Sequence, residues 1–124
     1  MATYHTFEII KGSTFRATLE CGDGEGGIRD LTGAKVWVGL KLNSDDDDSA
    51  APILIDSVAN SSQFDMTHAD ISVPFTLTHE NTSADGLLSG QTYKFAIKVK
   101  LADGTYAYPV LGEAIVQAGI IDAT

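Results

Sequence analysis

Most of the chain alternates apolar and polar side chains with a period of two residues. Successive side chains of a β-strand point to opposite faces, so this spacing predicts strands with one buried face and one wet face. Spacing typical of helices is almost absent. The predicted strands cover residues 3–10, 14–21, 34–42, 52–59, 71–77, 91–101 and 106–117, with 91–101 as the longest and an interruption of the last strand at Pro109 and Gly112.

The third predicted strand places its one tryptophan on the polar face. Val36, Val38, Leu40 and Leu42 all fall on the opposite, apolar face, which leaves Trp37 among polar residues. Either Trp37 is an anchor for a protein interface, where tryptophan is enriched, or a bulge turns its ring into the core. We favour core packing or partial cover of the ring.

Glycine-containing segments mark the predicted turns. Gly12 closes the first strand, and Asp103-Gly104 predicts a two-residue hairpin turn that pairs the last two strands antiparallel. Residues 22–27 are too polar and too rich in glycine to pack, so they predict a surface loop. Residues 78–86 hold one helical turn at most.

Prolines indicate which strands lie at sheet edges. Pro52 and Pro74 predict edge strands, because proline has no N–H for the ladder, and Pro109 predicts a kink or bulge. Ile71 is expected to point inward at the start of its strand. Seven or eight short strands without a repeat or a linker predict one domain, residues 1–124, with the all-β fold of an immunoglobulin-like antiparallel β-sandwich. A small closed barrel is the alternative.

The composition of the chain limits the classes of molecule that it is expected to bind. Seventeen acidic and eight basic residues give a formal charge of −9, which disfavours binding to nucleic acid or to an anionic membrane. No segment is long and apolar enough for a membrane span, and the N-terminus lacks the pattern of a secretion signal. We therefore expect the protein to be made in a cytoplasm. Cys21 is alone, so it forms no disulfide within the chain.

The residue types needed for catalysis are present but not grouped. His5, His68 and His79 lie far apart, without the spacing of metal ligands, and no nucleophile motif occurs. The four aspartates 45–48 lack the alternation of a calcium loop, so a mobile, solvated loop is favoured over a cation site. We expect no enzyme activity, no cofactor and no metal.

Lysines gather on the polar faces of two predicted strands. If those strands are neighbours, one outer face carries a lysine stripe while acidic residues crowd the loops, which favours docking on acidic copies of this chain or on another protein. Alternatively, lysines on outer faces only keep the sheet soluble. The candidate interface comprises Lys35, Trp37, Lys41, Lys94, Lys98 and Lys100, together with the apolar pair Ile120 and Ile121 that continues into a partner or frays.

Four segments resemble structural proteins of bacteriophages, as in the N-terminal sandwich of baseplate upper proteins and in tail and head-decoration modules. These segments are residues 10–15 (IKGSTF), 29–36 (RDLTGAKV), 88–95 (LSGQTYKF) and 112–116 (GEAIV), with Gly104 in the hairpin. The resemblance implies a virion structural protein, a capsid decoration or a tail, neck or baseplate component. It also implies other virion proteins or further copies of the chain as partners. The alternative is a carbohydrate-binding module that stacks sugars on Trp37, Tyr106 and Tyr108.

Overall fold

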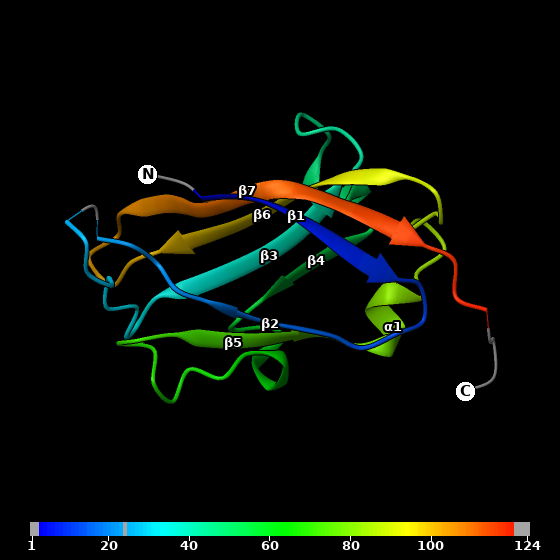
Figure 1. Ribbon diagram of the computed structural model, residues 1–124. Helices are drawn as coiled ribbons and strands as arrows, with labels where there is room; N and C mark the ends of the chain where they lie inside the picture. The colour runs from blue at the N-terminus through cyan, green and yellow to red at the C-terminus, as the bar shows by residue number, and fades with distance from the viewer. Residues whose placement is uncertain (1–2, 24, 121–124) are drawn as a thin grey trace.

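The computed structural model describes residues 3–23 and 25–120, which fold into two β-sheets and three short helical turns (Figure 1). The helical turns are η1 (Asp48–Ala50), η2 (Ser61–Gln63) and α1 (His79–Thr82), so the expected limit of one helical turn in residues 78–86 is confirmed. The strands are β1 (Thr3–Ile10), β2 (Phe15–Leu19), β3 (Lys35–Lys41), β4 (Ile53–Asp56), β5 (Val73–Leu77), β6 (Thr92–Lys100) and β7 (Tyr106–Gln117).

The strand order defines an immunoglobulin-like sandwich. The larger sheet has the order β1-β7-β6-β3-β4, and the smaller sheet pairs β2 with β5 below it in Figure 1. All neighbouring strands are antiparallel except β1 and β7, which run parallel. Strands three, four, six and seven in one sheet and strands two and five in the other match the variable-type immunoglobulin arrangement. The fold class is confirmed, and the closed-barrel alternative is wrong.

The core lies between the two sheets and is built from alternate residues of their strands. Each fully buried aliphatic or aromatic side chain stabilises the fold by about 1.5–3 kcal/mol relative to its exposure to water. Together these side chains hold the larger sheet as a stiff platform with one covered face and one free face. The most completely buried include Ile9, Leu19, Val36, Val38, Leu40, Ile53, Val73, Leu77, Phe95 and Val99.

Tyr93 ties the entry of β6 to the segment before it. Its hydroxyl accepts a hydrogen bond from the Leu88 N–H at 2.7 Å and donates one to the Gly86 carbonyl at 3.1 Å, while its ring is buried. A tyrosine near the start of this strand, bonded to backbone a few residues upstream, is a hallmark of immunoglobulin sandwiches. This contact fixes where the chain leaves α1 and enters the larger sheet.

Side-chain alternation fails only where the predicted strands were too long. Leu42 is 45% exposed and Ile71 is 57% exposed, although both were expected to point inward. Leu42 lies just beyond the end of β3, and Ile71 lies two residues before β5, so neither follows the pleat of a strand. Trp37 stays on the outer face and is half-buried, so partial cover is correct and the inward bulge is wrong.

The last strand has the expected bounds but is continuous. β7 runs unbroken through Pro109 and Gly112 and is the longest described strand, so the predicted interruption is wrong. The expected bulge is confirmed, because the register of β7 against β6 shifts between Ile97 and Val99. Gly112 is required by close approach: a Cβ here would overlap the backbone of His5 on β1.

The β6–β7 hairpin forms as expected, but with a longer turn. The Leu101 carbonyl accepts a hydrogen bond from the Gly104 N–H at 2.8 Å, and the Leu101 N–H donates one to the Thr105 carbonyl at 2.7 Å. The loop between these bonded residues therefore has three residues, 102–104. Gly104 has φ of +91°, whereas no described residue other than glycine has a positive φ. The geometry is that of a three-residue loop ending in a left-handed glycine, and the predicted two-residue turn is wrong.

Candidate functional site

The free face of the larger sheet, directed away from β2 and β5, carries the six predicted interface residues of β3 and β6. The two strands are antiparallel neighbours, with Lys35 opposite Lys100, Trp37 opposite Lys98, and Lys41 opposite Lys94. The condition for a common face is therefore met. We call Lys35, Trp37, Lys41, Lys94, Lys98, Lys100, Tyr106 and Tyr108 the lysine–aromatic face.

Lys98 is the centre of an aromatic cluster on this face. Its ammonium lies 4.8 Å from the Tyr106 ring centroid and 5.6 Å from those of Trp37 and Tyr108. Trp37 and Tyr106 stack with centroids 6.5 Å apart, and Lys35 lies 4.8 Å from the Trp37 centroid. Cations over ring faces attract the negative face of the π-system, so the rings partly replace carboxylates as partners for these lysines.

The aspartate-rich loop folds toward the same face. Within residues 3–23 and 25–120, the only ion pair joins Lys41 Nζ to an Asp48 carboxylate oxygen at 2.7 Å. Lys41 also donates to the Asp46 carbonyl at 2.8 Å, and the Asp48 carboxylate raises the pKa of Lys41. Asp47 caps η1 by accepting from the Ser49 N–H, which lowers the Asp47 pKa.

A groove of about 770 Å³ crosses the lysine–aromatic face. The groove exists because Gly39 and Ala96, opposite each other on β3 and β6, carry little or no side chain and leave space above the sheet. Leu54 extends this row onto β4, and Leu111 extends it onto β7. The floor of the groove is therefore apolar, with Lys41 and Lys94 on one side of it and Trp37 and Lys98 on the other.

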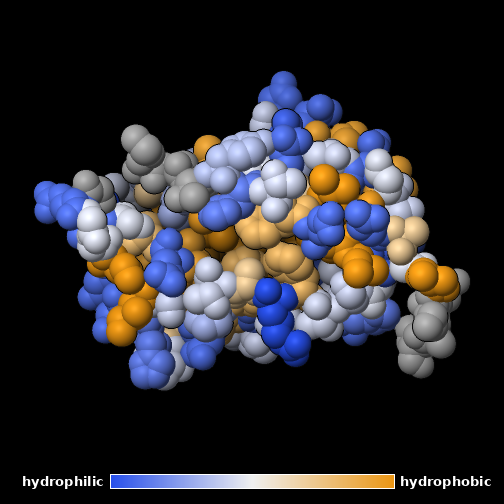
Figure 2. Space-filling view, in the orientation of Figure 1, coloured by the Kyte–Doolittle hydropathy of each residue, from blue (hydrophilic) through white to orange (hydrophobic). Residues whose placement is uncertain are grey.

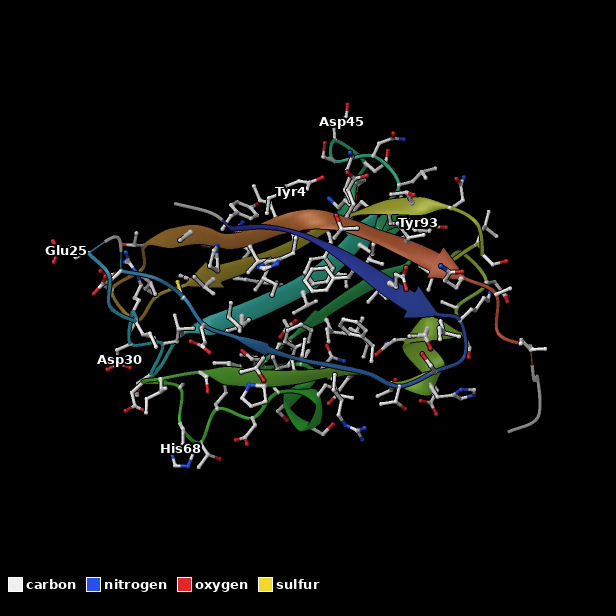
Figure 3. The ribbon with its side chains drawn as sticks, in the orientation of Figure 1. Tyr4, Glu25, Asp30, Asp45, His68 and Tyr93 are labelled. Atoms are coloured by element: carbon white, nitrogen blue, oxygen red, sulfur yellow. The ribbon has the colours of Figure 1, made fainter. Side chains whose placement is uncertain are left out.

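Tyr4 of β1 lines one end of the groove and is bonded to Glu113 of β7. The Tyr4 hydroxyl donates to the Glu113 carboxylate at 2.5 Å, and this bond raises the Tyr4 pKa. Figure 3 shows that Tyr4 and the loop with Asp45 lie on the same side of the sheet. Tyr4, Leu54 and Leu111 were not predicted as site residues, although each is a large, largely apolar side chain exposed on its strand.

A second, smaller cleft opens between the two sheets. It has a volume of about 240 Å³ and lies between β1 and β2, with Phe7, Ala17 and Phe75 among its lining. Figure 2 shows apolar atoms in this hollow. The cleft is the open side of the sandwich, because β1 pairs only with β7 and β2 pairs only with β5 among the described strands.

The remaining candidate residues do not join these features. His68 lies in a loop at the far side of the smaller sheet (Figure 3), and His79 Nδ1 is bonded to the Gly12 carbonyl at 2.7 Å. No three His, Cys, Asp or Glu side chains of the described residues are grouped as metal ligands would be. Ile120 is 99% exposed after β7, and Ile121 lies outside the described residues.

Comparisons with known proteins identify no family. No family model matches the chain, and no curated protein does. Similar solved structures include ICOS in complex with ICOS-L and an anti ICOS-L VNAR domain, murine CRIg, and extracellular domains of the voltage-gated sodium channel beta4 subunit in parallel homodimers. Helices of the described residues are all too short or too polar to cross a membrane.

These structural similarities are remote. Sequence identities are 16%, 12% and 13%, and TM-scores are 0.40, 0.37 and 0.35, in the same order. The matches cover 94%, 90% and 98% of this chain and 56%, 92% and 92% of the other chains, so this chain spans little more than half of the first. The class assigned here, an immunoglobulin-like sandwich, rests on the strand order and on the Tyr93 corner.

Proposed function

We propose that this chain is a non-catalytic structural protein of a bacteriophage particle, as a capsid decoration or a tail, neck or baseplate component. It acts through protein contacts made by the lysine–aromatic face. The observation that carries the proposal is the exposure of tryptophan, tyrosine and lysine side chains together on one stiff sheet. Tyr106 is 54% exposed and Tyr108 49% exposed, beside half-buried Trp37. Aromatic anchors of this kind dominate the energetics of protein interfaces.

The assignment to a phage particle comes from the sequence resemblance alone, and the structure shows what the resembling segments do in the fold. The glycines of the resembling segments occupy positions where the fold needs them: Gly12, Gly33, Gly90 and Gly104 all have positive φ. At Gly112 of β7 an added Cβ would overlap the His5 backbone of β1. The segments that resemble phage proteins therefore include the turns and the close strand contact on which this fold depends.

Mass spectrometry of purified particles of the phage that encodes this chain tests the proposal. We expect the protein in stoichiometric amounts, and electron microscopy of the particle to place it on the head, neck, tail or baseplate with its larger sheet against a neighbour. Absence of the protein from purified particles would defeat the proposal. The same absence would also contradict the predicted location of the protein in the virion.

A carbohydrate-binding function is the second candidate, because Trp37, Tyr106 and Tyr108 share one surface. Sugars bind aromatic rings by stacking on their faces, yet here Lys35, Lys98 and their neighbour Lys100 lie over those faces. A sugar would have to displace these ammonium groups. A glycan array decides the question: specific hits that disappear in Trp37→Ala favour this function, and an array without hits removes it.

A further inference from the structure

The two lysines of β6 that flank the groove on the lysine–aromatic face have the spacing of residues in an extended peptide that crosses the groove along β6. Lys94, Ala96 and Lys98 follow one another along the same face of β6. Four residues of a strand span about 13 Å, so the two lysines stand about 13 Å apart with the small Ala96 between them. An extended segment running along β6 has the same spacing between its own residues i and i+4.

The charge of the groove is opposite to that of the chain. Lys35, Lys94, Lys98 and Lys100 make no ion pair within the described residues, although the chain as a whole has a formal charge of −9. Apolar residues such as Leu54 and Leu111 line the groove between its basic sides. Positive charges on both sides of an apolar floor favour a ligand whose carboxylates lie on the lysines and whose aliphatic side chain lies on the floor between them.

The chain itself provides one example of such a contact. The Asp48 carboxylate lies 2.7 Å from Lys41 Nζ at the edge of the groove, and Ser44 and Ala51 of the same loop also line it. Lys41 is the partner of Lys94 across β3 and β6. One lysine of the groove thus already holds a carboxylate, while Lys94 and Lys98 do not.

We propose that this groove binds an extended acidic segment of a partner protein. The segment places carboxylates at positions i and i+4 on Lys94 and Lys98, and a small aliphatic side chain at i+2 over Gly39 and Ala96. The inference rests on the proposed contact function of this face and names the chemistry of the partner. Two identical faces do not fit each other equally well, because lysines would meet lysines. A nucleic acid is disfavoured by the acidic chain around the groove.

The test uses a labelled peptide with this pattern, fluorescein-Gly-Ser-Asp-Thr-Val-Thr-Asp-Ser-Gly, and the full chain. We expect saturable binding by fluorescence anisotropy, together with a change in the emission of Trp37, which is the only tryptophan. Raising the salt from about 0.05 to 0.5 M should weaken binding several-fold, because salt screens exposed charges. The matched peptide with asparagine in place of both aspartates should bind at least about fivefold more weakly.

Three variants of the protein locate the site. Lys98→Glu is expected to weaken binding about tenfold, because it replaces an attraction with a repulsion. Arg16→Glu on β2 makes the same change of charge on the smaller sheet and should leave binding unchanged. Asp48→Asn should strengthen binding about twofold, since it frees Lys41 for the ligand. Circular dichroism checks that each variant folds, and Lys94→Glu replaces Lys98→Glu if that variant does not.

Four results would overturn the inference. They are no binding of the peptide, equal binding of its asparagine form, equal losses in Lys98→Glu and Arg16→Glu, or tighter binding of a ten-residue oligothymidylate than of the peptide. Sedimentation of the protein alone tests for a second copy: a dimer that Lys98→Glu dissolves would assign the groove to that copy and reject the acidic segment. If the peptide does not bind but the protein is found in virions, this inference alone is rejected. If the peptide binds but the protein is absent from virions, only the phage function is rejected.

Discussion

Single side chains hold the junctions between the strands. Tyr93 connects β6 to the segment that precedes it through two hydrogen bonds, and Gly112 allows β1 to lie against β7. On the free face, Lys98 has the corresponding central place, since its ammonium is close to three rings. Each of these positions has a matched residue elsewhere in the chain that lacks the contact, so each role is open to a controlled test.

Tyr93→Phe should lower the free energy of unfolding by about 1–3 kcal/mol, because the Leu88 N–H and the Gly86 carbonyl lose their partner in a partly buried place. Tyr106→Phe is the control, since its ring is exposed, and it should change stability by less than about 0.5 kcal/mol. Urea unfolding followed by circular dichroism measures both. Equal effects of the two substitutions would show that the corner has no special role.

Gly112→Ala should lower stability by about 3 kcal/mol, because a methyl group here meets backbone atoms of His5 that have no room to move. Gly22→Ala adds the same methyl group where no atom lies within 4 Å, and should be tolerated. Thermal unfolding compares the two variants. A stable Gly112→Ala protein would contradict the tight parallel pairing of β1 and β7.

At the level of elements, the aspartates organise the turns. Carboxylates accept hydrogen bonds from backbone N–H groups two to four residues further on. The pKa of each carboxyl group is lowered, for Asp30 and Asp65 first by the threonine side chain two residues on and then by its N–H, and for the others first by backbone N–H groups. The sequence predicted only that these acids are wet, which they are. Their positions explain why so acidic a chain keeps its loops defined. The six are Asp23, Asp30, Asp47, Asp56, Asp65 and Asp103.

This arrangement predicts a specific dependence on pH. A carboxyl group whose pKa is lower in the folded state binds fewer protons there, so its stabilising effect is present above the unfolded pKa of about 3.9. That effect is lost as the pH falls through the folded pKa. Asp56→Asn should therefore make the loss of stability below about pH 4 shallower, because Asp56 accepts from Val58 and Ala59.

Acid unfolding of Asp56→Asn, followed by tryptophan fluorescence, measures the effect. Asp45→Asn is the control, because Asp45 is exposed and its carboxylate accepts no hydrogen bond within the described residues. The same slope for Asp56→Asn and for the unchanged protein would contradict this role of the turn.

The limits of sequence analysis also appear at this level. Period-two alternation located β1 at its observed bounds and gave the buried faces of β3 and β6, because the pleat is a local property. Which strands become neighbours depends on contacts distant in sequence. The parallel pairing of β1 with β7 and the contact of Lys41 with Asp48 therefore had no local signal. The groove was missed for the same reason, since its floor combines single small residues from different strands.

At the scale of the whole molecule, positive and negative charges lie on different parts of the surface. Basic residues gather on the free face of the larger sheet, whereas carboxylates hold turns and loops around it, and the chain remains acidic overall. The smaller sheet covers the other face of the platform, as Figure 1 shows. A stiff sheet with one covered face and one basic, aromatic face is suited to repeated docking on acidic partners. The proposed function depends on this docking.

Lysine labelling in the assembled particle tests whether this face docks on a partner. Free protein and purified particles are treated with an amine-reactive reagent, and the modification of each lysine is measured by mass spectrometry. We expect Lys94, Lys98 and Lys100 to lose most of their reactivity in the particle, whereas Lys11, whose ammonium donates to the Leu87 carbonyl away from this face, reacts equally in both. Unchanged reactivity of Lys94, Lys98 and Lys100 in the particle would contradict the account.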